Sequence, residues 1–164
     1  MRKINCIYLD MDGVIADFET RYKQLFGILP SETRNNREFD SYFDKFIADN
    51  NFATLEMMPD AMKIVVALRN ALPPTQILSS TASQKRYDAI SKQKKEWLAK
   101  HEIDFQANFV PGKHLKKKYA RKDTLIIDDT ESVINDWREA GGLAIFHRNV
   151  PDTLAQLKFL LEGA

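Results

Sequence analysis

Two aspartates and a glycine directly follow the first apolar run of the chain, in Asp10-Met11-Asp12-Gly13-Val14. A carboxylate at the end of a strand can attack phosphorus and form an aspartyl-phosphate, which divides a hydrolysis into two easier steps. Asp10 is placed for that attack, and Asp12 can protonate the leaving oxygen and later remove a proton from water. Gly13 lets the backbone turn sharply there. An isolated Asp-x-Asp-Gly is also a common turn, so the rest of the chain must decide between the two interpretations.

A second acidic pair, Asp128-Asp129, follows another apolar run late in the chain. Ligands of an open parallel sheet bind beyond the carboxyl ends of its strands, so both acidic pairs are expected at one edge. Four converging carboxylates repel one another unless a cation lies among them. Oxygen ligands without His or Cys nearby favour magnesium over softer metals, and over calcium when a substrate phosphate shares the ion. We predict a Mg²⁺ site formed by Asp10, Asp12, Asp128 and Asp129.

Lys94 lies within the apolar stripe of a predicted helix, three residues before Trp97 and four after Ile90. A lysine that faces a sheet is costly unless an anion meets it. We interpret Lys94 as reaching the substrate phosphate and the carboxylates. In the alternative interpretation its alkyl chain follows the stripe and its ammonium reaches solvent.

Hydroxyl groups end the second predicted strand, at Ser79 and Ser80. They can donate hydrogen bonds to phosphate oxygens, or one of them can cap the following helix. Ser79 is the favoured phosphate ligand because it comes directly after the apolar run. Phe18, just past the acidic turn, can stack on a base or belong to a local core.

One dense cluster of basic residues precedes the second acidic pair, and its members are Lys113, His114, Lys116, Lys117, Lys118, Arg121 and Lys122. Such a run can contact nucleic acid or a polyphosphate. It is more often a solvated helix face, which is the interpretation we favour.

The chain has 164 residues, enough for one core that carries a small insertion. Its 44% apolar and 29% charged residues are typical of an ordinary globular protein and exclude a disordered chain. The formal net charge of +1 indicates no general partner. The single Cys6 favours a reducing compartment, and we expect the cytoplasm. The first apolar run reaches Asp10 too soon for a targeting segment or a membrane span.

Five short apolar runs predict strands, with helical patterns between them: Ile4–Leu9, Gln76–Leu78, Phe109–Val110, Thr124–Ile127 and Leu143–Phe146. Most lack polar alternation, which is typical of strands buried on both faces of a parallel sheet. We predict an α/β fold.

A βαβ crossover needs about 30 residues, and roughly twice that number separates the first two predicted strands. The excess carries its own helical stripes, so we expect a small helical cap at 16–59 and an α/β core at 1–15 and 60–164. Pro59 is expected to start the helix that returns to the sheet, Pro73-Pro74 to end it, and Asp152 to cap the last helix.

The acidic turn at 10–14, Ser79, Lys94 and Asp128-Asp129 together resemble the four motifs of the haloacid dehalogenase superfamily, in order and spacing from end to end. Within it, residues 10–19 and 55–61 resemble segments of the 5'(3')-deoxyribonucleotidases. The resemblance implies a three-layer, Rossmann-like core with a parallel sheet and a small helical cap inserted after the first strand.

The same resemblance implies a role for each matching position. Asp10 is the nucleophile and Asp12 the acid and base. Magnesium binds Asp10, the Asp12 carbonyl and Asp128, while Asp129 orients a water on the metal. Ser79 and Lys94 hold the phosphate, and Phe18 stacks on the base.

We therefore expect a phosphomonoesterase, a Mg²⁺-dependent enzyme whose partner is a small-molecule phosphomonoester, a (deoxy)nucleoside monophosphate above all. The alternatives are a phosphatase of nucleic-acid 3'-phosphate ends, suggested by the basic run, and a phosphatase of small sugar phosphates. A non-catalytic binding module is least favoured, since neither nucleophile nor metal ligand is lost. No membrane partner is expected.

Overall fold

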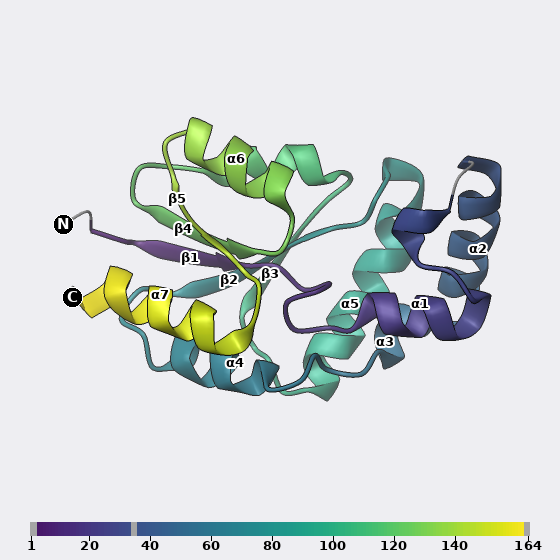
Figure 1. Cartoon of the computed structure of the whole chain (residues 1–164), viewed down its shortest axis with the longest axis horizontal. Helices are drawn as coiled ribbons and strands as arrows, with labels where there is room; N and C mark the ends of the chain where they lie inside the picture. The colour runs from purple at the N-terminus through teal and green to yellow at the C-terminus, as the bar shows by residue number, and fades with distance from the viewer. Residues whose placement is uncertain (1–2, 34–35, 163–164) are drawn as a thin grey trace.

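The computed structural model describes residues 3–33 and 36–162, and within them five strands form one parallel sheet (Figure 1). The strand order is β3-β2-β1-β4-β5. The strands are β1 (Cys6–Leu9), β2 (Thr75–Ser80), β3 (Gln106–Val110), β4 (Thr124–Asp128) and β5 (Leu143–Phe146). The predicted α/β class and its parallel sheet are confirmed.

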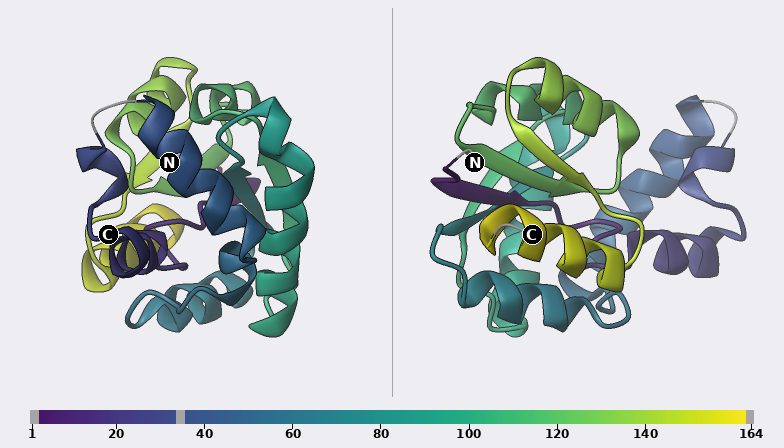
Figure 2. Two further views of the ribbon diagram at one scale, coloured as in Figure 1. Left: turned by 90° about the vertical axis from the view of Figure 1, so that its right-hand side faces the viewer. Right: turned by 60° about the vertical axis from the view of Figure 1, so that its left-hand side comes forward.

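Helices cover both faces of the sheet, which makes three layers (Figures 1 and 2). One face packs against α4 (Ala61–Arg69), α5 (Tyr87–Lys100) and α7 (Val150–Glu162). The other face packs against α6 (Glu131–Glu139) and the 3₁₀ segment η3 (Lys113–Tyr119), and a further short turn, η2 (Gln84–Arg86), precedes α5.

Neighbouring side chains of the central strand enter different cores. Ile7 and Leu9 belong to the core under α4, α5 and α7, while Tyr8 packs edge-on against Tyr119 and Trp137, each with ring centroids 5.5 Å away. Because both faces are covered, the strand is apolar at every position and shows no polar alternation. This is why the strand positions could be predicted from short apolar runs.

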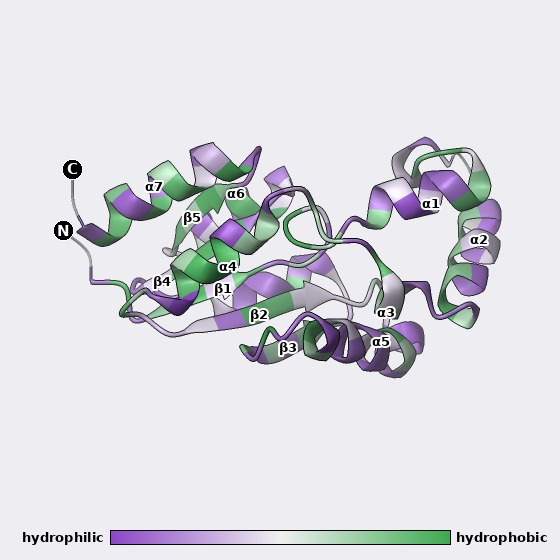
Figure 3. Cartoon of the chain, turned by 90° about the horizontal axis from the view of Figure 1, so that it is seen from below, coloured by the Kyte–Doolittle hydropathy of each residue, from purple (hydrophilic) through white to green (hydrophobic). Residues whose placement is uncertain are grey.

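A helical insert lies between β1 and β2, beyond one end of the sheet (Figure 3). It contains α1 (Phe18–Phe26), η1 (Pro30–Glu32), α2 (Asn36–Ala48) and α3 (Asn51–Thr54). The segments entering and leaving it run side by side and are joined by backbone hydrogen bonds. Asp17 N donates to Glu56 O at 2.9 Å, and Met58 N donates to Ile15 O at 2.8 Å. The insert is therefore joined to the sheet through two paired connections.

Three predicted helix boundaries differ from the structure. Helix α4 begins at Ala61, after Asp60 in a left-handed conformation, and ends at Arg69, so neither Pro59 nor Pro73 bounds it directly. Helix α7 begins at Val150, and the side chain of Asn149 accepts a hydrogen bond from Asp152 N at 2.9 Å. Asn149 is thus the capping side chain, and Asp152 lies in the first turn, where its charge favours the helix dipole.

Within residues 3–33 and 36–162, none of the helices combines the length and the apolar character needed to cross a membrane.

Candidate active site

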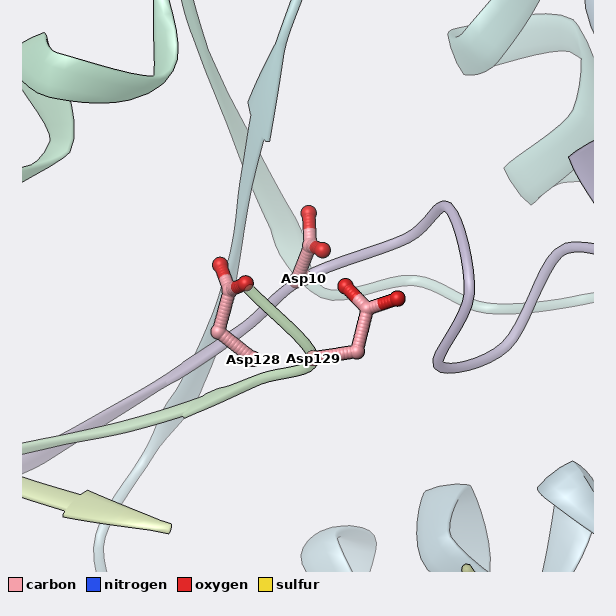
Figure 4. Close-up of side chains that lie close together, drawn as sticks. All are labelled: Asp10, Asp128 and Asp129. Carbon is pink, nitrogen blue, oxygen red and sulfur yellow. The ribbon is translucent and has the colours of Figure 1, made fainter. Parts of the chain in front are cut away.

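The register of the two central strands brings the two acidic pairs together. Leu9 pairs with Ile127, and Asp10 N donates to Ile127 O at 3.0 Å, so Asp10 and Asp128 leave the same edge of the sheet. Carboxylate oxygens of Asp10, Asp128 and Asp129 lie within 4.8 Å of one another (Figure 4). The predicted convergence of acidic strand ends is present for these three residues.

Gly13 allows the acidic turn to pass beside this group. Its φ of +82° is unfavourable for a residue with a side chain. A Cβ atom there would lie only 2.0 Å from Asp129 Oδ2. The Asp-x-Asp-Gly segment is thus both a tight turn and one wall of an acidic site.

Lys116 contacts two of the three clustered carboxylates, a position that differs from the solvated face predicted for the basic run. Its side chain is buried, with 1% of the residue exposed, and Nζ donates to Asp10 Oδ1 at 2.8 Å and to Asp128 Oδ2 at 2.7 Å. Burial alone would lower the pKa of Lys116, but the two carboxylates outweigh it and raise that pKa above its usual value. Lys116 is therefore a charged ammonium that bridges the two strand ends.

The interpretation of the basic run as a solvated face is wrong for Lys116 and fits its neighbours. Exposed members are Lys113, His114, Lys117, Lys118, Arg121 and Lys122. Buried positions in this segment recur every four residues, at Gly112, Lys116 and Ala120. That spacing next to the apolar Leu115 and Tyr119 is a signal by which Lys116 could have been separated from the exposed lysines.

Lys94 is buried as well, with 1% of the residue exposed, so its ammonium does not reach solvent as in the alternative interpretation. Its Nζ donates to Asp12 Oδ2 at 2.8 Å, to Ser79 Oγ at 2.7 Å and to Ser80 O at 2.9 Å. The expected meeting of Lys94 with a carboxylate is present. The carboxylate is Asp12, whereas Asp10 and Asp128 are paired with Lys116 instead.

Three of the four predicted acidic residues are thus divided between two lysines. The side chain of Asp12 is held by Lys94 and does not belong to the group formed by Asp10, Asp128 and Asp129. Three carboxylates, and not four, are the side chains that could share one metal ion.

Ser79 and Ser80 point to different surroundings because successive side chains of a strand alternate. Ser79 is fully buried and its hydroxyl accepts the hydrogen bond from Lys94. Ser80 lines the pocket in front of Asp10, and its hydroxyl accepts from Ala82 N at 3.1 Å. Of the two hydroxyls, that of Ser80 therefore belongs to the residue that lines the pocket.

A cavity of about 370 Å³, here called the aromatic pocket, opens between the acidic residues and the insert. Its polar wall contains Asp10, Asp12, Ser80, Lys113 and Lys116. The opposite wall is apolar and consists of Phe18, Pro30, Phe39, Phe43, Phe52 and Ile90, with Ala82 at the side. Phe18 stacks on Phe52 with ring centroids 5.5 Å apart, so it lines the pocket and also packs within the insert.

The acidic group carries more negative charge than Lys116 neutralises. Burial and the charge of Asp10 raise the pKa of Asp128 from 3.8 to about 6, against the opposing effect of Lys116. Partial desolvation and the charges of Asp10 and Asp128 raise the pKa of the more exposed Asp129 from 3.8 to about 7. A set of oxygen ligands with excess negative charge suits a hard divalent cation such as Mg²⁺.

These shifts predict how stability depends on pH in metal-free protein. Asp128 and Asp129 bind protons more tightly in the folded state, so the free energy of unfolding should fall as pH rises from about 4 to about 7. Mg²⁺ at pH 7 should reverse part of that loss by binding the ionised folded site. Thermal melts with EDTA and with Mg²⁺ at several pH values check this, and a metal effect no larger at pH 7 than at pH 4 would contradict it.

No protein-family model matches the sequence, and no curated protein shows significant sequence similarity to it. Solved structures are similar in fold. A hydrolase from Streptococcus pneumoniae TIGR4 is 16% identical with a TM-score of 0.56, over 98% of this chain and 99% of that one. A HAD family hydrolase from Deinococcus radiodurans R1, with bound phosphate and sodium, is 13% identical with a TM-score of 0.58, over 98% and 89% of the two chains.

A chain of the Pnkp1/Rnl/Hen1 RNA repair complex is also similar, with 14% identity and a TM-score of 0.51 over 88% of this chain. The match spans 42% of that longer chain. At these identities the likeness concerns the fold. The protein has the Rossmann-like α/β fold of the haloacid dehalogenase-like hydrolases.

Proposed function

We propose that the protein is a Mg²⁺-dependent phosphomonoester hydrolase that acts through an aspartyl-phosphate on Asp10, with nucleoside monophosphates as its substrates. The observation that carries the proposal is the position of Asp10. This nearly buried carboxylate leaves the central strand, pairs with the ammonium of Lys116, and faces the aromatic pocket between two further carboxylates.

The residues support a balanced sequence of two displacements. A carboxylate oxygen of Asp10 attacks phosphorus, the bond from phosphorus to the ester oxygen breaks, and Asp12 gives its proton to the departing oxygen. In the second step Asp12 takes a proton from water, whose oxygen attacks phosphorus, and the bond between Asp10 and phosphorus breaks. Inorganic phosphate leaves and both aspartates return to their starting states.

Asp10 and Asp128, together with Asp129, are the side chains that would hold the metal, and the Asp12 carbonyl is a further ligand in our proposal. When bound, the ion supplies positive charge that neutralises the phosphate and stabilises charge in the transition state. Lys116 holds the carboxylate of Asp10 in place, and Ser80 is positioned to donate to a phosphate oxygen after its hydroxyl rotates.

The aromatic pocket supports a nucleotide as the substrate. A phosphate placed at Asp10 leaves the rest of the molecule against the apolar wall, where Phe18, Phe43 and Phe52 present aromatic rings. Stacking of a base on an aromatic side chain contributes about 1–3 kcal/mol and is tolerant of base identity. A small sugar phosphate would leave most of that wall without contacts.

We further propose that residues 16–59 act as a cap on a core formed by 1–15 and 60–164. Arg86, which precedes α5, donates to Asp40 and Asp44 of α2, in each case at 2.9 Å. Gln93 of α5 bonds to Phe52 N at 3.1 Å and to Ile47 O at 2.8 Å. These contacts join the insert, which carries most of the apolar wall, to helix α5 of the core.

A panel of phosphate-release assays tests the proposal. Deoxynucleoside and ribonucleoside monophosphates, small sugar phosphates and 3'-phosphorylated oligonucleotides are each assayed with Mg²⁺ and with EDTA. We expect Mg²⁺-dependent release from monophosphates. Activity restricted to sugar phosphates would reject the nucleotide part, and release that persists in EDTA would reject the metal dependence. No release from any substrate would favour a binding module.

A phosphatase of nucleic-acid ends is the second candidate, because an exposed basic residue of the pocket lining belongs to a segment with further exposed lysines. Lys113 lines the pocket, and Lys117 and Lys118 extend from the same segment into solvent. A Lys117→Ala, Lys118→Ala double variant should lose activity on 3'-phosphorylated oligonucleotides and keep activity on monophosphates if this candidate is correct. Lys116 is left unchanged in this test, because its loss would affect every substrate.

A further inference from the structure

We infer that Lys94 is a positioning residue that orients Asp12 for proton transfer and that it does not bind the substrate phosphate. The inference rests on the proposed function, since it concerns the acid and base of that reaction. It assigns different tasks to the two buried lysines: Lys116 holds the nucleophile, and Lys94 holds the proton donor.

The ammonium of Lys94 has no donor left for a phosphate. A lysine has three N–H groups, and those of Lys94 meet Asp12 Oδ2, Ser79 Oγ and Ser80 O at distances of 2.7–2.9 Å. The ring of Phe52 lies 5.3 Å from Nζ, which adds a cation–π contact on a further side. Lys94 is also absent from the lining of the aromatic pocket, in contrast to Lys116.

The pairing distinguishes the two oxygens of Asp12. Oδ2 accepts from Lys94, while Oδ1 is shielded from solvent and has no hydrogen-bond partner among the described residues. Lys94 thereby fixes the direction in which the carboxyl group of Asp12 points.

Helix α5 is well anchored for this task. Residues on either side of Lys94 are tied to the exit of the insert, through the two bonds of Gln93 and through Trp97 Nε1, which donates to Leu55 O at 2.8 Å. Ser79 presents its hydroxyl from the neighbouring strand β2. The ammonium is therefore held from both sides, and its direction toward Asp12 does not depend on a bound substrate.

The test uses two substrates that differ in their need for a proton. An alkyl phosphomonoester needs protonation of its leaving oxygen, whereas p-nitrophenyl phosphate releases a stable phenolate without it. In Lys94→Met, the first-turnover rate of leaving-group release should fall by about 10²–10⁴-fold for the alkyl ester, the usual contribution of general acid catalysis. For p-nitrophenyl phosphate the first turnover should change by less than about tenfold.

A double-mutant cycle tests whether Lys94 acts through Asp12. Asp12→Asn should reproduce the substrate dependence of Lys94→Met, and the double variant should lose little more than either single variant. Lys92→Met is the matched control, because Lys92 is exposed on the same helix. Lys94→Gln, whose amide NH₂ keeps two N–H donors, should recover part of the alkyl-ester rate and provides the same comparison if the Met variant does not fold.

Equal first-turnover losses on both substrates, or losses that add in the double variant, would overturn the inference and indicate a phosphate ligand instead. A wild-type protein that releases nothing from either substrate would overturn the proposed function, and this inference with it. The two failures are therefore distinguishable by the wild-type activity alone.

Discussion

Asp10→Asn should lower turnover by roughly 10⁴-fold or more, the scale on which loss of a nucleophile affects covalent catalysis. The amide keeps the shape of the side chain and removes the charge that attacks phosphorus. Because Asp10 raises the pKa of Asp128 and Asp129, its neutralisation also removes repulsion, and the fold should stay intact. Initial rates and circular dichroism measured on the same preparation check both expectations.

A second readout of this variant follows the covalent intermediate. Wild-type protein incubated with a substrate carrying radioactive phosphate and then denatured in acid should retain label, whereas Asp10→Asn should retain none. Asp104→Asn is a suitable control, because Asp104 is an exposed carboxylate at the opposite end of strand β3 from the site. An Asp10→Asn protein as active as wild type would require a different nucleophile.

Much of the fold could be predicted because buried strands appear in the sequence as short, continuous apolar runs. Strands β1 and β4 are buried on both faces, so they are continuous apolar runs, and the polar residues that end them mark the edge where ligands bind. Lys94 could be predicted in the same way. A charged residue inside an apolar helical stripe signals a buried partner, although the stripe itself does not identify Asp12 as that partner.

The identity of the carboxylates that Lys116 meets depends on contacts that a local pattern does not contain. Its partner Asp10 lies 106 positions away in the sequence, and Lys117 and Lys118 beside it have the same chemistry. Its direction is decided by the 3₁₀ geometry of η3 over the edge of the sheet. The choice between Ser79 and Ser80 also could not be made from the sequence. Successive side chains of β2 point to opposite faces of the sheet, and the sequence does not show which of the two serines faces the pocket.

Among residues of the site that take no part in bond formation or proton transfer, Lys116 should be the most sensitive to substitution. Lys116→Met should lower both activity and stability. It leaves Asp10 and Asp128 buried without their shared counter-ion, and removing one partner of a buried ion pair costs about 3–5 kcal/mol. Activity should fall by about 10²-fold or more, because Asp10 loses the hydrogen bond that holds it in position for attack. Melting temperatures and initial rates in Mg²⁺ buffer measure the two losses.

The stability loss should also depend on pH and on metal. Protonation of Asp128, whose pKa is already raised to about 6, removes the unpaired charge, so Lys116→Met should lose less stability at pH 5 than at pH 8. Mg²⁺ at pH 8 should restore more stability to the variant than to the wild type, since the ion supplies the missing positive charge. Lys117 is the neighbouring residue and is exposed, so Lys117→Met should change neither the stability nor its response to Mg²⁺ measurably. If both variants melt alike at pH 8 in EDTA, Lys116 does not offset the charges of the two strand-end carboxylates, and the proposal that it holds Asp10 in place would have to be abandoned.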